Sequence, residues 1–309
     1  MFPSDKLEIR YSKIYNSKAN KDIRVLSISD IHISNTFTNE EMIFLIRSVK
    51  SECPDYICIL GDIIDKADFL DYEINQNIFK KFLVLLSKIA PVFLILGNHD
   101  YIIYRKKNEY EEKYNDKFWK EIDKLENVSV INNKKIVLKD IVICGYFEKK
   151  NIYHKKTKDA FSKDFINIKD IKLKNSTKPT VLIMHSPEPL DDEENQRIVK
   201  EYDIVLCGHY HDGCMPAFLN KVWPIKHGGI ITPDKKLFPK CVRGIKKLKY
   251  GNYLVYNGGW KKISRKNLCF LDKLCNRQID ITIITNDEKY KNIEIYTKKI
   301  KNESKKEPK

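Results

Sequence analysis

Five short apolar runs, each followed at once by a polar motif, place the strongest limit on how this chain can fold. The runs span residues 23–29, 56–60, 91–96, 181–184 and 204–207. They are nearly continuously hydrophobic, which is typical of strands that are covered on both faces. The pattern therefore predicts buried sheets, with helices in the stretches between the strands.

Aspartate, asparagine and histidine side chains come directly after these runs. They lie in the segments Asp30-Ile31-His32, Gly61-Asp62-Ile63-Ile64-Asp65, Gly97-Asn98-His99-Asp100, His185 and Gly208-His209-Tyr210-His211, which hold five of the seven histidines. Because ligands of α/β sheets gather at the carboxyl ends of strands, we expect these segments to converge on one rim. A single site that can hold two metal ions would result.

The residue types in these segments suit divalent cations. Imidazole and carboxylate ligands favour zinc, manganese or iron, and the chain contains no Cys-x-x-Cys pair that would favour a thiolate site. Any one Asp or His after a strand is more often a helix cap or a hydrogen-bonded polar residue than a ligand. Five such segments in one chain favour a metal centre.

The five motifs, in this order, resemble those of the calcineurin-like metallophosphoesterases over residues 23 to 212. The pattern is Asp-x-His, Gly-Asp-x-x-Asp, Gly-Asn-His-Asp/Glu, His and Gly-His-x-His. The resemblance implies an α+β fold in α/β/β/α layers, that is, a sandwich of two mixed sheets flanked by helices, with the active site at the strand ends. It also implies hydrolysis of a phosphate ester by attack of a hydroxide that bridges two metal ions.

The resemblance assigns a role to each residue. One ion would be bound by Asp30, His32, Asp62 and His211, and the other by Asp62, Asn98, His185 and His209, so that Asp62 bridges them. His99 would act beside the leaving group as a general acid or a positive charge, with Asp100 orienting its ring. Asp65 would lie behind the ligands.

Residues around the motifs favour one branch of the family. Gly61–Ala67 lacks the Asp-Arg-Gly continuation of the serine/threonine protein phosphatases, and Asp100 stands where those enzymes carry Glu. Residues 185–187 and 202–213 resemble the bacterial phosphodiesterase branch that includes UDP-2,3-diacylglucosamine hydrolases, although Tyr210 and residues 212–214 depart from its pattern. We expect a phosphodiesterase acting on a lipid- or nucleotide-linked phosphate. A nuclease of the same fold and a non-catalytic scaffold are the alternatives.

The loop 213–244 combines apolar and aromatic residues with lysines, and this combination allows several interpretations. It could be a lid over the site, with Trp223 and His227 as candidate substrate-binding residues, or a contact with a membrane surface. The alternative is an ordinary loop that packs its aromatic side chains onto the sandwich. Cys214 follows the proposed ligands by three residues, and the histidine and carboxylate set is complete without it.

The formal net charge of +15 suits an anionic partner such as nucleic acid or an anionic membrane surface. However, the sequence contains no compact motif of arginine and aromatic residues, so dispersed, solvated lysines are favoured and a nucleic-acid partner is not. No protein partner is implied. Eight cysteines and the lack of a signal-like apolar segment indicate a cytoplasmic protein, with a peripheral position at a membrane as the alternative.

The remaining composition predicts the outer boundaries and several elements. We expect an amino-terminal extension over 1–22, one metallophosphoesterase domain over 23–297 and a disordered basic tail over 298–309. Thr38 and Glu41 form a capping-box signature for a helix that ends before Pro54. Further helices are predicted over 74–89 and 104–127, and strands over 128–131, 136–138, 141–143, 253–256 and 279–284, of which the first three are expected to be antiparallel.

Overall fold

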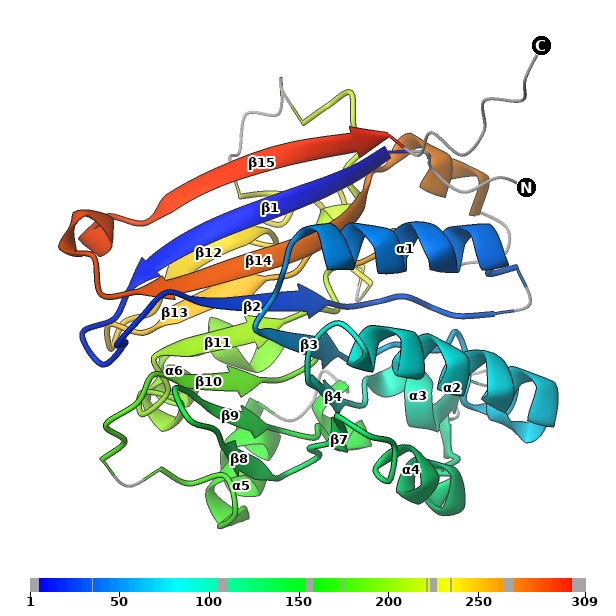
Figure 1. Cartoon of the computed structure of the whole chain (residues 1–309), viewed down its shortest axis with the longest axis horizontal. Coiled ribbons are helices and arrows are strands. Elements are labelled where there is room, and N and C mark those ends of the chain that lie inside the picture. The colour runs from blue at the N-terminus through cyan, green and yellow to red at the C-terminus, as the bar shows by residue number, and fades with distance from the viewer. Residues whose placement is uncertain are drawn as a thin grey trace.

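Two stacked sheets form the centre of the protein, and helices cover their outer faces (Figure 1). The computed structural model describes residues 6–34, 36–104, 110–153, 158–173, 175–220, 222, 227–233, 235–263 and 269–301. The first sheet has seven strands in the order β15-β1-β14-β2-β3-β4-β7, and the second has six in the order β12-β13-β11-β10-β9-β8. The predicted α/β/β/α architecture is confirmed.

The strand bounds follow the predicted apolar runs closely at the centre of each sheet. The first sheet contains β15 (Glu294–Lys301), β1 (Lys6–Tyr15), β14 (Arg277–Thr285), β2 (Ile23–Ile28), β3 (Tyr56–Leu60), β4 (Val92–Ile95) and β7 (Val128–Val130). The second contains β12 (Gly244–Lys247), β13 (Tyr253–Tyr256), β11 (Ile204–Cys207), β10 (Thr180–Ile183), β9 (Val142–Gly145) and β8 (Lys135–Val137).

The central strands are apolar throughout because both of their faces are buried. In β3, Ile57 and Ile59 pack under the helices, whereas Cys58 and Leu60 face the second sheet. Side chains alternate between the two faces of a strand, so each strand contributes to two separate cores. This double burial explains why the runs are continuous rather than alternating.

The helices bury one apolar stripe each against the sheets. Those on the first sheet are α1 (Asn39–Ser51), α2 (Glu73–Ser87) and α4 (Asp116–Ile122), and those on the second are α5 (Lys158–Asn167) and α6 (Glu193–Ile198). Thr38 caps α1, since its side chain accepts a hydrogen bond from Glu41 N at 3.1 Å. Met42, Leu45 and Val49 then lie on the buried face at helical spacing.

The carboxyl ends of the central strands from both sheets meet at one rim. Strands β2, β3 and β4 are parallel to one another, as are β9, β10, β11 and β13. Backbone hydrogen bonds join the loops within and between the sheets: Asp30 N donates to Gly61 O, Gly208 N to His185 O, and Trp260 N to Ser29 O. The predicted convergence of the polar motifs is therefore built into the backbone.

Both ends of the chain differ from our expectation. Residues 1–22 were predicted to be an extension, but β1 (Lys6–Tyr15) lies inside the first sheet, parallel to β14 and antiparallel to β15. Lys298–Lys301, predicted to be disordered, form the last part of β15. Composition misled us here because β15 is an edge strand with exposed side chains, where lysines are well tolerated. Residues 302–309 lie outside the described residues.

The segment 102–130 also differs. In place of one long helix, the chain forms a small two-stranded sheet of β5 (Ile102–Tyr104) and β6 (Tyr110–Glu112), followed by the short helix α4. Strand β7 joins the first sheet parallel to β4, and only β8 and β9 form the expected antiparallel pair. The charged and aromatic composition of this segment gave no sign of the break.

Candidate metal centre

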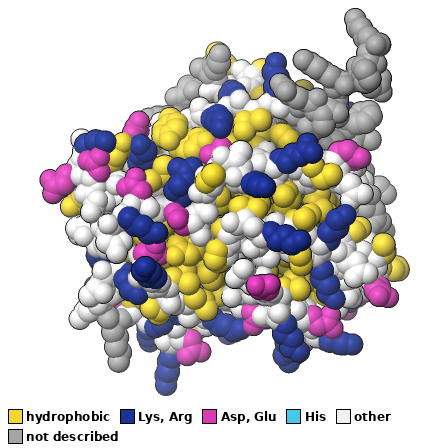
Figure 2. All heavy atoms as spheres, viewed as in Figure 1, with side chains coloured by type: hydrophobic (Ala, Val, Ile, Leu, Met, Phe, Trp, Pro, Cys, Tyr) yellow, Lys and Arg dark blue, Asp and Glu magenta, His cyan; other side chains and the backbone are white. Residues whose placement is uncertain are grey.

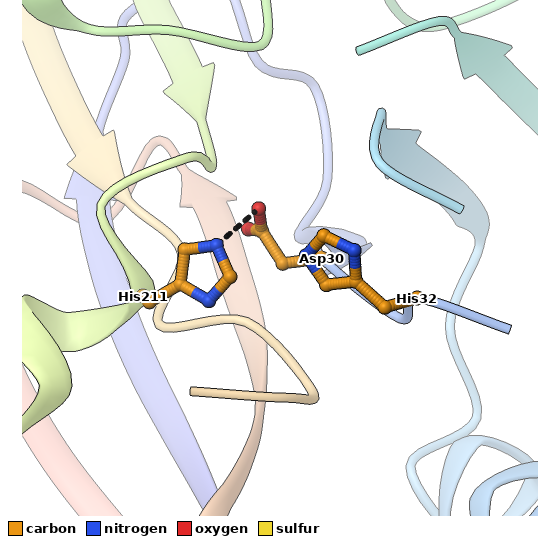
Figure 3. A group of neighbouring side chains, drawn as sticks. All are labelled: Asp30, His32 and His211. Carbon is orange, nitrogen blue, oxygen red and sulfur yellow. Dashed lines mark ion pairs between the residues drawn. The ribbon is translucent and has the colours of Figure 1, made fainter. Parts of the chain in front are cut away.

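Asp30, His32 and His211, which we call the first group, bring their ligand atoms within 4.8 Å of one another (Figure 3). Asp30 and His32 follow β2, and His211 begins the short 3-10 helix η5 (His211–Cys214) after β11. His211 Nε2 lies 3.3 Å from Asp30 Oδ1, and all three residues are buried. Two loops that are distant in sequence thus present one carboxylate and two imidazoles to the same point.

Asp62, His185 and His209, the second group, meet in the same way. These residues follow β3, β10 and β11. His185 Nε2 lies 3.2 Å from both Asp62 Oδ2 and His209 Nδ1. Asn98, at the start of helix α3 (Asn98–Tyr101), is buried as well.

His99 lies between the two groups. Its ring packs edge-on against the His32 ring, with centroids 4.8 Å apart, and its Nε2 is 4.0 Å from Asp62 Oδ2. The His99 ring Nδ1 is 2.7 Å from the carbonyl oxygen of Asp65. Because a carbonyl oxygen can only accept a hydrogen bond, Nδ1 carries the proton of that bond. The other ring nitrogen, Nε2, is directed toward Asp62. About a quarter of the His99 side chain is exposed, so a substrate can reach it.

Asp100 differs from our expectation that it orients the His99 ring. Its Oδ1 accepts hydrogen bonds from Ile63 N and Ile64 N, and its Oδ2 accepts one from Gly97 N. A carboxylate at the third position of a helix commonly binds backbone N–H groups in this way. Burial and the neighbouring Asp62 raise the pKa of Asp100 to about 7. Asp100 joins the loops after β3 and β4, and the Asp65 carbonyl orients His99.

Backbone carbonyl oxygens orient one histidine in each group. Leu60 O lies 2.7 Å from His185 Nδ1, and Lys261 O lies 2.8 Å from His211 Nδ1. Each contact places the proton on Nδ1 and leaves Nε2 to face the carboxylate of its own group. Histidines that bind metals are commonly fixed in the same manner.

The backbone at the site is strained. Asp30, His32, Asp62, His209 and His211 all have φ between 48° and 65°, in the left-handed region that non-glycine residues rarely adopt. Each such residue costs on the order of 1–2 kcal/mol. Strain of this kind is concentrated at functional sites, where the surrounding structure enforces it.

The glycines of the motifs allow close approach. A Cβ on Gly97 would lie 2.3 Å from Asp62 Oδ1, although its φ is not in the left-handed region. A Cβ on Gly208 would lie 1.7 Å from Ser29 Oγ. Both positions therefore exclude any side chain, because neighbouring loops are in contact there: those after β3 and β4 at Gly97, and those after β2 and β11 at Gly208.

The charges of the site favour a bound cation. Although burial opposes ionisation, the Asp62 carboxylate raises the pKa of His185 to about 10. Burial and the adjacent His99 keep the pKa of His32 well below its ordinary value. Asp30 Oδ1 and both ring nitrogens of His32 have no hydrogen-bond partner within the described residues. Buried oxygen and nitrogen atoms normally have a hydrogen-bond partner. These atoms of Asp30 and His32 therefore fit the role of metal ligands.

Sequence reasoning missed Glu148 and Tyr153, which support the second group. Glu148 is completely buried, and its carboxylate accepts hydrogen bonds from Ser186 N and from the hydroxyl of Tyr153. The Tyr153 ring lies 5.7 Å from the His209 ring between centroids. Burial raises the pKa of Glu148 to about 7, against the opposing effect of His185. The position of Glu148, three residues after the apolar run of β9, was a sequence signal that could have identified it.

The described candidates in the loop 213–244 are not members of the candidate metal-binding groups. His227 Nδ1 is 3.1 Å from Arg243 O, and His227 belongs to none of the candidate metal-binding groups found among the described residues. Cys214 donates a hydrogen bond to Lys262 O and is likewise outside these groups. Trp223 lies outside the described residues. The loop does expose apolar side chains, with Phe218, Val222, Leu237 and Phe238 each more than half exposed.

The positive charge is dispersed on the face drawn in Figure 2. Lysine and arginine side chains are spread over it singly, separated by hydrophobic and acidic ones. Among the helices in the described ranges, all are too short or too polar to cross a membrane.

Comparison with known proteins agrees with this geometry. Residues 23–213 match the family model of the calcineurin-like phosphoesterases. An uncharacterized metallophosphoesterase of Helicobacter pylori (strain ATCC 700392 / 26695) is 25% identical over 211 residues, which cover 67% of this chain and 49% of that protein. The chain thus spans about half the length of the Helicobacter relatives that it matches.

The match to a second relative covers a larger share of both chains. The UDP-2,3-diacylglucosamine pyrophosphatase LpxG of Chlamydia muridarum is 25% identical over 287 residues, or 78% of this chain and 79% of that protein. A dimetal phosphatase from Danio rerio superposes with a TM-score of 0.42 at 10% identity, over 78% of this chain and 88% of that one. Since the family model covers more than half of the sequence, the chain belongs to the calcineurin-like phosphoesterase family.

Proposed function

We propose that the chain hydrolyses phosphodiesters with two divalent metal ions, and that its substrate carries a lipid or a nucleotide on the phosphate. The observation that carries this proposal is the pair of buried donor groups on one rim, each with a carboxylate and two imidazoles. Manganese, zinc and iron all suit such donors. The family to which the chain belongs supports the same chemistry.

The ligands follow from the two groups. The first group together with Asp62 would hold one ion, and the second group together with Asn98 would hold the other. Asp62 suits the shared role because its Oδ2 lies 3.2 Å from His185 Nε2 of the second group, while its backbone oxygen accepts a hydrogen bond from His32 N of the first group at 3.1 Å. The raised pKa of His185 applies only without metal, because a ligating imidazole must give up its proton.

Bound ions of this kind supply Lewis acidity, which activates water and neutralises charge on phosphoryl oxygens. The chain itself contributes position and a proton. His99 is held through Nδ1 by the Asp65 carbonyl, and this contact would direct its Nε2 toward the leaving oxygen of the ester. In the imidazolium form, with a second proton on Nε2, His99 would give that proton to the leaving oxygen or stabilise its negative charge. Asp100 serves this step indirectly, since it fixes the backbone of the loops after β3 and β4.

The test uses metal-stripped protein reloaded with manganese, zinc or iron. We expect cleavage of bis-p-nitrophenyl phosphate to exceed that of p-nitrophenyl phosphate, and to be lost in Asp62→Asn and His99→Ala. His227→Ala is the matched control, because His227 belongs to neither group and its Nδ1 contacts Arg243 O. A preference for the monoester would move the search to phosphatases. Protein that binds no metal would favour the scaffold alternative.

A lipid-linked substrate is supported by two observations. LpxG, by its name, acts on a diacylated nucleotide sugar, and the loop 213–244 exposes Leu237 and Phe238. We expect Leu237→Ser with Phe238→Ser to raise KM for UDP-2,3-diacylglucosamine without changing cleavage of the p-nitrophenyl diester. Ile74→Ser, an equally exposed apolar residue on α2, is the control. Cosedimentation with anionic liposomes would report on the proposed membrane contact.

A nuclease is the weaker candidate. The net charge of +15 favours it, but the dispersed lysines of Figure 2 do not form a continuous track for a nucleic-acid backbone on that face. Cleavage of DNA or RNA with a steep dependence on salt concentration would reverse this order.

A further inference from the structure

One residue outside the family-matched segment contacts every member of the first group. Lys261 N donates a hydrogen bond to Asp30 O at 2.9 Å, and Lys261 O accepts one from His211 Nδ1 at 2.8 Å. The side-chain Nζ of Lys261 donates to His32 O at 2.9 Å. Within the described part of the chain, Lys261 makes no hydrogen bond to a member of the second group.

The segment that carries Lys261 is itself firmly held. Gly259, at φ +77°, lets the backbone approach Asp30, because a Cβ there would lie 3.0 Å from Asp30 Cβ. The next residue, Trp260, is completely buried, and its Nε1 donates to Glu41 Oε1 at 2.7 Å. Arg277 donates to Trp260 O and pairs with Glu41. Lys261 thus projects from a rigid support rather than from a loose loop.

The side-chain contact of Lys261 acts on a strained residue. His32 has φ 48°, and its ring nitrogens have no hydrogen-bond partner among the described residues. The ring packs against those of His99 and His211, and its Nδ1 lies 3.7 Å from Asp65 Oδ1. The ammonium of Lys261 holds the carbonyl of His32 and thereby the backbone conformation from which the ring projects. A lysine near a cation site would otherwise repel the ion, yet here its Nζ points at a carbonyl oxygen.

We propose that Lys261 is a positioning residue for the metal ion of the first group, which it assembles by fixing Asp30, His32 and His211 together. This inference rests on the proposed two-metal function. Removing the ammonium weakens binding of the first ion and leaves the second ion unchanged. Contacts behind a metal ligand typically change metal affinity 10–100-fold.

The experiment is a calorimetric titration of metal-stripped protein with manganese. Lys261→Met keeps the backbone contacts and the apolar stem, and removes only the Nζ contact with His32. We expect two binding events in the wild type, and in Lys261→Met one unchanged event with the other weakened about 10–100-fold. Lys261→Arg restores most of the affinity. His211→Ala and His185→Ala identify which event belongs to which group.

Lys178→Met is the matched control, because Lys178 Nζ also donates to a backbone carbonyl, that of Leu138, away from the rim. Two unchanged binding events in Lys261→Met, or tighter binding through loss of repulsion, would overturn the inference while the proposed function stands. A wild type that binds no metal would overturn both. If circular dichroism shows that Lys261→Met does not fold, Lys261→Arg takes its place. Binding of both ions with wild-type affinity in Lys261→Arg supports the role, and weaker binding of the second ion contradicts it.

Discussion

The two halves of the candidate metal centre are supported by different parts of the chain. In the second group, His185 is oriented by the carbonyl of Leu60, at the end of β3, inside the family-matched residues 23–213. In the first group, His211 is oriented by the carbonyl of Lys261, which lies beyond that range. The family-matched residues therefore include the carbonyl that orients the histidine of one group but not the carbonyl that orients the histidine of the other.

The first group also carries more strain. Asp30, His32 and His211 all have φ near 50°, whereas in the second group this holds for Asp62 and His209 but not His185. Left-handed residues cost on the order of 1–2 kcal/mol each, so the first group depends more on contacts that enforce its shape. Two sites with similar ligand atoms can therefore differ in how easily they lose their metal ion and their ligand arrangement.

Metal removal has the largest expected effect and gives the most direct test of this difference. A graded chelator should release the ion of the first group at lower concentration, and full chelation should abolish diester hydrolysis. The melting temperature should fall in two steps, because each bound ion stabilises the folded state by mass action. Inductively coupled plasma analysis of dialysed samples gives the ion count at each step. A single concerted loss would show that the two halves are not independent.

Replacing one histidine from each group should separate them. We expect His211→Ala and His185→Ala each to lower kcat/KM by roughly a hundredfold or more, since removal of a ligand costs much of the charge stabilisation at the transition state. His211→Ala should retain one tightly bound ion, whereas His185→Ala should retain only the more weakly bound one. Equal residual affinities in the two variants would contradict the proposed asymmetry.

Gly97→Ala should damage the second group selectively. The added Cβ would meet Asp62 Oδ1 at 2.3 Å, and the φ of −95° means that the effect is steric rather than conformational. We expect a loss of about 1–3 kcal/mol in the free energy of unfolding, as for other overpacked sites, together with weaker binding of the second ion. Urea unfolding and metal titration provide the two measurements. A lower free energy of unfolding without any change in metal affinity would mean that the added Cβ strains a part of the structure other than the second group.

A smaller, pH-dependent effect is expected at the support of the loop that carries His211. Asp212 pairs with Arg10 of β1 at 3.1 Å, and Arg10 lies 3.8 Å from Asp280 of β14. Burial raises the pKa of Asp280 to about 6 despite Arg10. Between about pH 4 and pH 6 the folded state therefore keeps a proton that the unfolded state releases, so this residue's contribution to stability falls as pH rises.

Comparison with Asp280→Asn isolates that contribution. The stability of the wild type relative to the variant should decline by roughly 1–3 kcal/mol from pH 4 to pH 6, since one pKa unit corresponds to about 1.4 kcal/mol. Thermal melts of metal-free protein across this range supply the measurement. A difference that stays constant with pH would mean that Asp280 is ionised throughout.

The strands that carry the site were predictable because double burial leaves a plain record in the sequence. Runs such as 56–60 and 204–207 end where β3 and β11 end, and the polar residues after them meet at the rim. Strand β1 was missed because Glu8, Arg10 and Ser12 interrupt its apolar residues, and all three are buried in the structure. Charged residues read as surface when their buried partners are distant in sequence.

The supporting contacts were harder to predict for a different reason. Lys261 orients His211 through its backbone carbonyl, a group that every residue possesses, so its side chain gives no signal of the role. The same is true of Leu60 and Asp65. Glu148 could have been noticed after β9, but its partners Ser186 and Tyr153 become neighbours only through the second sheet.

The position of β14 between β1 and β2 has a consequence for how the protein is made. On the ribosome, β1 and β2 emerge long before the strand that separates them, since Leu7 pairs with Arg277. Contacts between residues so far apart in sequence form late and slowly. Lys261 emerges only shortly before β14, so a nascent chain can shape the second group well before the first is complete.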